Sequence, residues 1–265
     1  MPVFDLAGAG PDLICLPGGP GRDPEYLENL GGLDALHRLV IVHPRGAGRS
    51  PMPTDPTLLG ADRLADDVAE IADHLHLHRV DLLAHSAGAY GAVLCASRNP
   101  NLLRRLALVT PTRQLAPDIR DDTDEIFNAR ADEEWFPAVQ RALGEPEPES
   151  VSAMLEQAQR IAPAFYGRWD DRQRIHAAGE MRQFCIPALE GNPEPPHVDK
   201  AKTLLSSTKV LVITGSSDAA AGVAIGDAVA AMFTDATHTT IDGSGHYPWV
   251  DVPTAFTNAV NTFLA

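Results

Sequence analysis

One serine at the end of a buried strand most constrains what this chain can fold into. Residues 80–84 are apolar except for Asp81 and predict a strand, residues 87–98 predict a helix, and Ser86 stands at the turn between them. Ala84 and Gly88 lie two positions before and after it. Bulky side chains at these two positions would clash, because the strand and the helix pass very close to each other in so sharp a turn. The pattern is typical of an exposed serine nucleophile, although glycine is more usual at the first position. An ordinary strand-to-helix turn is the structural alternative.

Length, charge and cysteine content narrow the classes of function. A chain of 265 residues is long enough for one substantial core with an insertion. It has 36 acidic and 21 basic residues, a net charge of −15, which disfavours binding to the phosphates of a nucleic acid. Three cysteines leave one over after any pairing, which suits a reducing compartment. We find no export signal and no apolar run of membrane-spanning length, so we expect a cytoplasmic protein that binds neither nucleic acid nor membrane.

Short apolar runs alternate with amphipathic stretches along most of the chain. Runs that are apolar on both faces are typical of parallel strands with helices on both sides. The sequence therefore predicts an α/β fold with a mostly parallel sheet flanked by helices. Strands are expected at residues 3–6, 13–16, 39–43, 80–84, 106–110, 209–215 and 237–241, and helices at residues 24–36, 58–77, 87–98, 222–233 and 253–264.

The alternation stops between two of the expected strands. Residues 112–200 are acidic and interrupted by prolines, and helices are expected at 121–143 and 151–161. An insertion placed at the edge of the sheet where ligands bind is well placed to act as a lid. We therefore expect a core of residues 1–112 and 201–265 with an inserted helical cap of residues 113–200. Helices packed elsewhere on the core are the alternative.

Three further features follow expected strands at their carboxyl ends, where ligands bind in parallel sheets. The glycine- and proline-rich residues 17–21 end a strand and leave a backbone that can approach a ligand, although a plain surface turn is the alternative. Asp218 and His246 each follow a strand, in the chain order serine, acid, histidine. His246 is then the expected general base toward Ser86, and Asp218 the group that orients it. Either residue alone is weak evidence, but three suitable residues at three strand ends are hard to obtain by chance.

With these residues the chain resembles the α/β-hydrolase superfamily and, within it, the prolyl iminopeptidase branch. The resemblance covers nearly the whole chain. Pro17-Gly-Gly-Pro-Gly21 is similar to the branch's His-Gly-Gly-Pro-Gly, and Pro44-Arg-Gly-Ala-Gly-Arg-Ser50 to its Asp-x-Arg-Gly-x-Gly-x-Ser. His85-Ser-Ala-Gly88 and Gly245-His246 complete the match.

The resemblance implies an α/β-hydrolase fold and further site residues. It implies that the backbone N–H groups of Gly19 and Ala87 form an oxyanion hole, and we also expect a cis peptide bond before Pro20. Pro17 and Ala84 depart from the branch, which has histidine and glycine there, so the hydrogen bonds of that histidine must be missing or replaced. The N-terminal strands are short, which predicts about seven strands where the superfamily usually has eight. This chemistry requires no cofactor and no metal.

The resemblance also implies a serine hydrolase that removes an N-terminal aminoacyl group from a small peptide or from a biosynthetic product. Members of the branch hold the free α-amine of the substrate with carboxylates of the cap, because a buried ammonium needs a counter-charge. Glu180 and Glu190 are the candidates here, whereas Ala219 stands where some members have a glutamate. The expected partner is a small-molecule or short-peptide substrate with a free amino terminus. The alternatives are a carboxylesterase, lactonase or thioesterase with the same triad, and a catalytically silent binding protein.

Overall fold

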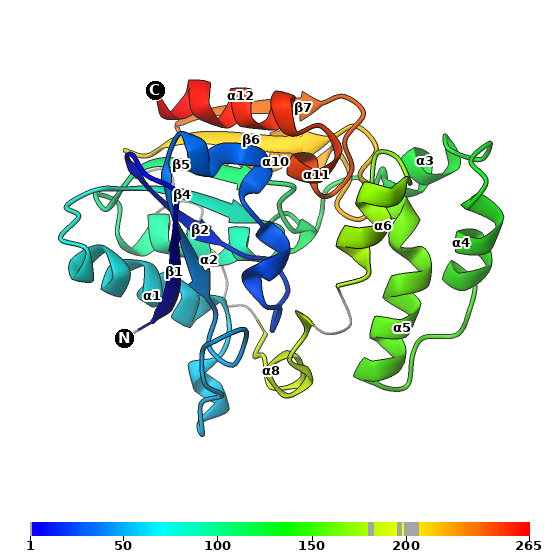
Figure 1. Ribbon diagram of the computed structural model, residues 1–265, viewed down its shortest axis with the longest axis horizontal. Coiled ribbons are helices and arrows are strands. Elements are labelled where there is room, and N and C mark those ends of the chain that lie inside the picture. Colours follow the sequence, from blue (N-terminus) through cyan, green and yellow to red (C-terminus); the bar gives the residue numbers. More distant parts are fainter. Residues whose placement is uncertain (1, 180–182, 195–197, 199–206) are drawn as a thin grey trace.

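A single sheet runs through the molecule in the computed structural model, which describes residues 2–179, 183–194, 198 and 207–265 (Figure 1). Within these residues seven strands form the sheet in the order β1-β3-β2-β4-β5-β6-β7. β1 pairs antiparallel with β3, and the other neighbours are parallel. The predicted fold class and strand number are therefore confirmed. The strands are β1 Val3–Ala7, β2 Asp12–Leu16, β3 Arg38–His43, β4 Val80–His85, β5 Leu103–Val109, β6 Lys209–Gly215 and β7 Asp235–Ile241.

Helices cover both faces of the sheet. On one face lie α1 (Ala61–His74), α2 (Gly88–Arg98) and α10 (Ile225–Ala230), and on the other α11 (Pro248–Asp251) and α12 (Pro253–Leu264). In Figure 1, α12 lies above the sheet and α1 and α2 lie below it. Successive residues of β2 alternate between the two cores: Ile14 and Leu16 pack with α1 and α2, and Leu13 and Cys15 pack with α12. Both faces of this strand are thus buried, as its continuous apolar run requires.

Three expected helices are shorter than their apolar patterns, and the one expected at residues 222–233 is reduced to α10, Ile225–Ala230. α1 begins after Gly60, whose φ is 92°, and ends before His76, whose φ is 57°. Both values lie outside the right-handed helical region, so the helix cannot extend over residues 58–77. The stretch expected as one helix at residues 24–36 forms two 3₁₀ turns, η1 (Pro24–Leu27) and η2 (Leu30–Ala35), and positive φ values at Gly31 and Gly32 lie within the second.

The segment between β5 and β6 is mostly helical. It contains η4 (Arg113–Leu115), α3 (Thr123–Asn128), α4 (Phe136–Leu143), α5 (Val151–Ile161), η5 (Ala162–Phe165), α6 (Asp171–Ala177) and α8 (Ile186–Glu190). In Figure 1, α3 to α6 lie side by side to the right of the sheet, at the end toward which the parallel strands point. The part around α8 packs on the glycine-rich loop, where Cys185 N donates a hydrogen bond to Gly21 O at 2.8 Å.

The expected single helix at residues 121–143 is wrong, because turns separate α3 from α4. Phe127 and Phe136 are nine positions apart, so on one continuous helix they would point to opposite faces. The break allows their rings to stack with centroids 4.5 Å apart, and both side chains are buried. Burial of two aromatic rings thus outweighs the local preference for an unbroken helix.

None of the helices in the described part of the chain is both long and apolar enough to cross a bilayer.

Candidate active site

Ser86 occupies the sharp turn between β4 and α2. Its φ is +51°, a value in the left-handed region that residues with a side chain rarely adopt. A Cβ atom on Gly88 would lie 2.3 Å from the carbonyl oxygen of Pro17, and one on Gly18 would lie 2.9 Å from Cβ of Ser86. The small residues are therefore needed because the turn and the glycine-rich loop are in direct contact.

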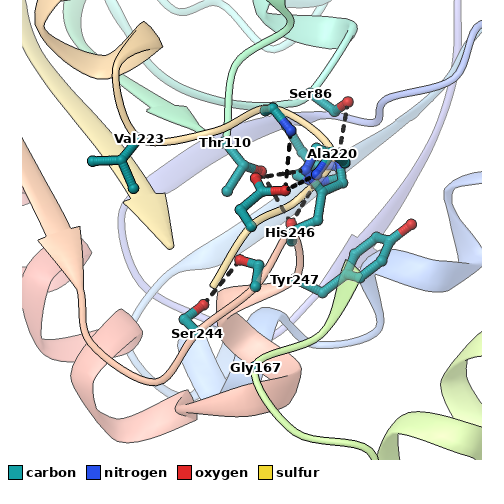
Figure 2. Close-up of polar contacts among 12 residues, drawn as sticks. Ser86, Thr110, Gly167, Ala220, Val223, Ser244, His246 and Tyr247 are labelled. Atoms are coloured by element: carbon teal, nitrogen blue, oxygen red, sulfur yellow. Dashed lines mark hydrogen bonds and ion pairs between the residues drawn. The ribbon is translucent and has the colours of Figure 1, made fainter. Parts of the chain in front are cut away.

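The structure brings Ser86, His246 and Asp218 together at the carboxyl ends of three strands. Nε2 of His246 lies 3.0 Å from Oγ of Ser86, and Nδ1 lies 2.9 Å from Oδ2 of Asp218 (Figure 2). Asp218 is fully buried, and its Oδ1 accepts hydrogen bonds from the backbone N–H groups of Ala220 and Ala221 at 2.8 and 3.1 Å. With the carboxylate oriented in this way, Nδ1 of the imidazole carries a proton and Nε2 can accept one from the serine hydroxyl.

Three other parts of the chain form hydrogen bonds with the backbone of His246. Its N–H donates to the carbonyl of Phe165 at 2.7 Å, so the segment between β5 and β6 supports the site directly. Its own carbonyl accepts from Oγ1 of Thr110 and from Nε2 of His85, both at 3.0 Å (Figure 2). The position of the imidazole is thus set by neighbours that are far away in the sequence.

A buried tyrosine, Tyr26, links His85 to the glycine-rich loop. The Tyr26 hydroxyl accepts the N–H of Gly18 at 2.5 Å and lies 2.8 Å from Nδ1 of His85. Since Nε2 of His85 donates to the carbonyl of His246, Nδ1 must be unprotonated and the tyrosine must donate to it. Burial lowers the pKa of His85 well below its ordinary value, with a further contribution from His246, which keeps the ring neutral.

A buried carboxylate fixes the loop that carries His246. Oδ2 of Asp251 accepts the N–H groups of Gly245 and Gly167, each at 2.8 Å, and its Oδ1 accepts from Nε2 of Gln173 at 2.9 Å. Burial raises the pKa of Asp251, whereas these hydrogen bonds act in the opposite direction. The aspartate therefore joins the loop of His246 to the segment between β5 and β6.

Sequence reasoning missed Tyr26, His85 and Asp251. His85 had a visible signal, because a polar residue directly before the serine ends an otherwise apolar strand. The other two had none, since they are joined to the site only by packing. Tyr26 supplies hydrogen bonds to the loop in which Pro17 replaces the branch's histidine.

The two backbone groups expected as an oxyanion hole belong to the residue after Ser86 and to the glycine-rich loop. Ala87 follows it at the N-terminus of α2, and Gly19, with φ +128°, belongs to the loop that contacts the serine. Within the described residues neither N–H has a hydrogen-bond acceptor. The Gly19–Pro20 peptide bond is cis, as expected. Both donors are therefore available to an oxygen that gains negative charge beside Ser86.

Of the two glutamates expected to hold an amine, only Glu190 belongs to the described residues. Glu180 lies outside the described residues. Glu190, at the end of α8, is exposed and does not line the cavity beside the serine turn. That cavity has a volume of about 130 Å³. Its walls are formed by the glycine-rich loop, the start of α2, the region before and within α1, and α8: Pro17, Gly18, Pro20, Gly21, Pro44, Arg45, Leu58, Leu59, Gly60, Ala61, Arg63, Leu64, Asp67, Ala87, Gly88, Tyr90, Gln114, Ala188 and Asn192.

Comparisons with curated proteins give local similarities to two kinds of hydrolase. A proline iminopeptidase from Heyndrickxia coagulans is 32% identical over 108 residues, which are 41% of this chain and 38% of that protein. A protein described as the carbamate hydrolase RutD of Agrobacterium fabrum is 30% identical over 107 residues, 40% of this chain and 41% of that protein. This chain thus matches less than half the length of either relative.

Solved structures match over almost the full length. The enol-lactonase from Burkholderia xenovorans LB400 has a TM-score of 0.71 and 22% identity, covering 99% of this chain and 95% of that one. An esterase from Exiguobacterium antarcticum has a TM-score of 0.73 and 16% identity, covering 98% and 94%. Likeness at such identity shows a shared fold. The family model of the alpha/beta hydrolase fold matches residues 11–251, so this chain belongs to the α/β-hydrolase family.

Proposed function

We propose that this protein is a serine hydrolase that cleaves an ester or amide through an acyl-enzyme on Ser86. The observation that supports it most is the unbroken hydrogen-bonded series Asp218–His246–Ser86, which lies beside two backbone N–H groups without acceptors. A serine hydroxyl is a weak nucleophile alone, and an oriented imidazole at 3.0 Å supplies the base it needs.

The proposed reaction uses these groups in two steps. Oγ of Ser86 attacks the substrate carbonyl while Nε2 of His246 takes its proton, and the N–H groups of Gly19 and Ala87 stabilise the oxyanion. The imidazolium, stabilised by Asp218, then protonates the leaving alcohol or amine. In the second step the same imidazole activates a water molecule, which releases the acid and regenerates the serine.

The cavity beside Ala87 suggests a compact acyl group. Its volume of about 130 Å³ is slightly below the roughly 150 Å³ of a cavity known to hold benzene, so it has room for about six heavy atoms. The α3 to α6 helices and the segment around α8 would cap the bound substrate, since residues of both contact the site or its loop. We place the reaction in the cytoplasm, which the three free thiols would suit.

Hydrolysis of an N-terminal aminoacyl amide is the second candidate. The 32% identity to a proline iminopeptidase favours it, as does the size of a prolyl group, whose roughly seven heavy atoms are close to what the cavity can hold. This candidate requires a carboxylate at the α-ammonium, the role assigned to Glu180 or Glu190. The partner is then a small molecule or short peptide with a free amino terminus.

A substrate panel and an active-site probe together test the proposal. A fluorophosphonate should add to Ser86, as peptide mass spectrometry would show, and the Ser86→Ala variant should remain unlabelled. Short-chain alkyl esters should be hydrolysed regardless of any amine. Fast cleavage of prolyl anilide, together with loss of activity when its amine is acetylated, would instead favour the aminoacyl candidate. A protein that takes up no probe and turns over no substrate would be a binding protein.

A further inference from the structure

The cavity beside Ala87 carries more positive than negative charge. The charged residues among its lining are Arg45, Arg63 and Asp67. Asp67 is only 1% exposed and is bound by Arg45, whose Nη2 lies 2.6 Å and whose Nε lies 3.2 Å from Oδ1. Arg45 thus pairs with the buried carboxylate, and Arg63 pairs with Asp66, which does not line the cavity. The lining itself therefore has one more positive than negative side chain.

Both arginines have N–H groups that no protein acceptor uses. Nε of Arg63 is buried and has no hydrogen-bond partner, and its Nη1 donates outward to Asp66, a half-exposed residue that does not line the cavity. Arg45 uses Nε and Nη2 for Asp67, and within the described residues its Nη1 has no acceptor. A buried donor without an acceptor destabilises the folded protein, so an acceptor supplied by a ligand at Nε of Arg63 would be favourable.

The N-terminus of α1 adds a third positive group to the same wall. Gly60, its N-cap residue, and Ala61 line the cavity, and no side chain caps the helix. A Cβ atom on Gly60 would lie 2.8 Å from Cγ of Pro193, so contact with that proline opposes replacing Gly60 by a capping residue. The acidic residue of the first turn, Asp62, is bound to Arg98 at the surface. The first N–H groups of this 14-residue helix therefore contribute partial positive charge that an anion can use.

Apart from Gln114 and Asn192, the remaining side chains of the wall are apolar. The same cavity is lined by Ala87 and Gly88 of the serine turn and by the positive groups. The apolar side chains include Leu58, Leu59, Leu64, Tyr90 and Ala188. A ligand that fills the cavity therefore needs a short hydrocarbon chain with an acceptor or negative charge at its far end.

We propose that the acyl group of the substrate carries a carboxylate of its own, which binds Arg63, Arg45 and the N-terminus of α1. This inference rests on the proposed hydrolase and identifies its substrate class as monoesters or monoamides of short dicarboxylic acids. The cavity volume limits the acyl chain to about four or five carbons. Release of the alcohol or amine leaves the acyl group on Ser86, and water then cleaves this acyl-enzyme to give the dicarboxylic acid and free Ser86. An ammonium in the same cavity would face the two guanidinium groups and be repelled.

Two esters of equal chain length test the assignment. Monoethyl glutarate and ethyl pentanoate differ chiefly in the terminal carboxylate, and ethanol release measures both. Wild-type protein should show a kcat/KM at least tenfold higher for monoethyl glutarate. Arg63→Met keeps a helix-forming side chain of similar length, and it should lower this ratio at least fivefold, mainly through KM, whereas Arg63→Lys should restore part of it. Arg120→Met, which removes an exposed arginine paired with Glu125, is the matched control and should leave the ratio unchanged.

The design separates failure of this inference from failure of the proposed hydrolase. The carboxylate site would be overturned if wild-type protein preferred ethyl pentanoate, or if Arg63→Met and Arg120→Met lowered the ratio of the two kcat/KM values equally. Turnover of ethyl pentanoate would still report the hydrolase activity in either case. Glutarate binding to the Ser86→Ala protein, measured by calorimetry, tests the site without turnover. Glutarate binding that the Arg63→Met substitution weakens at least fivefold would support the carboxylate site. The absence of any binding heat at millimolar glutarate would overturn it. Loss of turnover of both esters together with no fluorophosphonate adduct would refute the hydrolase itself.

Discussion

Tyr26→Phe removes one oxygen atom from the centre of the buried network. The hydroxyl accepts the N–H of Gly18 and donates to Nδ1 of His85, which in turn donates to the carbonyl of His246. The phenylalanine ring keeps the aromatic contacts, including that with the Arg22 guanidinium 3.8 Å from the ring centroid. The substitution therefore isolates the hydrogen bonds from the packing.

The expected loss follows from the two partners that remain. A buried polar group left without its partner costs about 1–3 kcal/mol, so the Gly18 N–H and the His85 nitrogen together should cost about 2–6 kcal/mol. That is a large part of the roughly 5–15 kcal/mol that holds a domain together. Gly19 follows Gly18, so its N–H should also move relative to Ser86. Removing an oxyanion donor lowers kcat about 10²- to 10³-fold, and a displaced donor should cost about tenfold.

Urea denaturation followed by tryptophan fluorescence would measure the free energy of unfolding, and steady-state kinetics with ethyl pentanoate would measure kcat. Tyr166→Phe is the matched control, because the Tyr166 hydroxyl lies 2.7 Å from Nδ1 of His176, a buried residue whose Nε2 bonds the backbone carbonyl of Tyr26 and not its hydroxyl. It should cost about 1–2 kcal/mol and change kcat by less than about twofold. A loss below about 0.5 kcal/mol for Tyr26→Phe, or an equal fall in kcat for both variants, would refute the reasoning.

Three further predictions concern the triad and the buried histidines. Ser86→Ala should abolish turnover and leave the urea midpoint unchanged, and activity above about a thousandth of wild type would assign the nucleophile elsewhere. Asp218→Asn should lower kcat by about 10⁴, because the amide favours the wrong tautomer of the histidine, and a fall of less than tenfold would move the acid to another residue. Burial lowers the pKa of His176 from 6.5 to about 4 and that of His85 well below 6.5, so both stay neutral in the folded state while the unfolded chain takes up protons. The stability of the folded protein is therefore unaffected by these histidines above the pKa of the unfolded chain. As the pH drops from about 6.5 to 5, each of the two histidines should lower the free energy of unfolding by about 1.4 kcal/mol per pH unit. Equal urea midpoints at about pH 7.5 and 5 would contradict this assignment.

Several elements follow their local patterns closely. The helices at Val151–Ile161 and Pro253–Leu264 have the predicted bounds, and each starts at a recognisable signal, Ser150 as N-cap or Pro253 at the first position. The helix expected at residues 121–143 fails because its two phenylalanines gain more by stacking on each other than the chain gains from one continuous helix. Apolar periodicity shows which side chains need burial, but it does not show which partner will cover them.

The residues of the triad could be found by position because each follows a strand. Parallel strands end at the same edge of a sheet, so residues 218 and 246 meet residue 86 once the alternation of strand and helix is recognised. No comparable rule leads to Tyr26, since its hydroxyl reaches the loop through packing on the other core. The role of the two arginines at the cavity is equally hidden, because neither the motif at residues 44–50 nor the amphipathic pattern around Arg63 indicates which residues they meet.

The sequence by itself determined the α/β class, the strained serine turn and the order of the three triad residues. These depend on neighbouring residues, on the period of apolar side chains and on a sheet rule that needs no coordinates. Only the tertiary structure decided which groups hold His246 and what charge lines the cavity beside Ala87. Hydrogen bonds and ion pairs between segments tens of residues apart depend on how the cores pack, and local sequence patterns do not encode that packing.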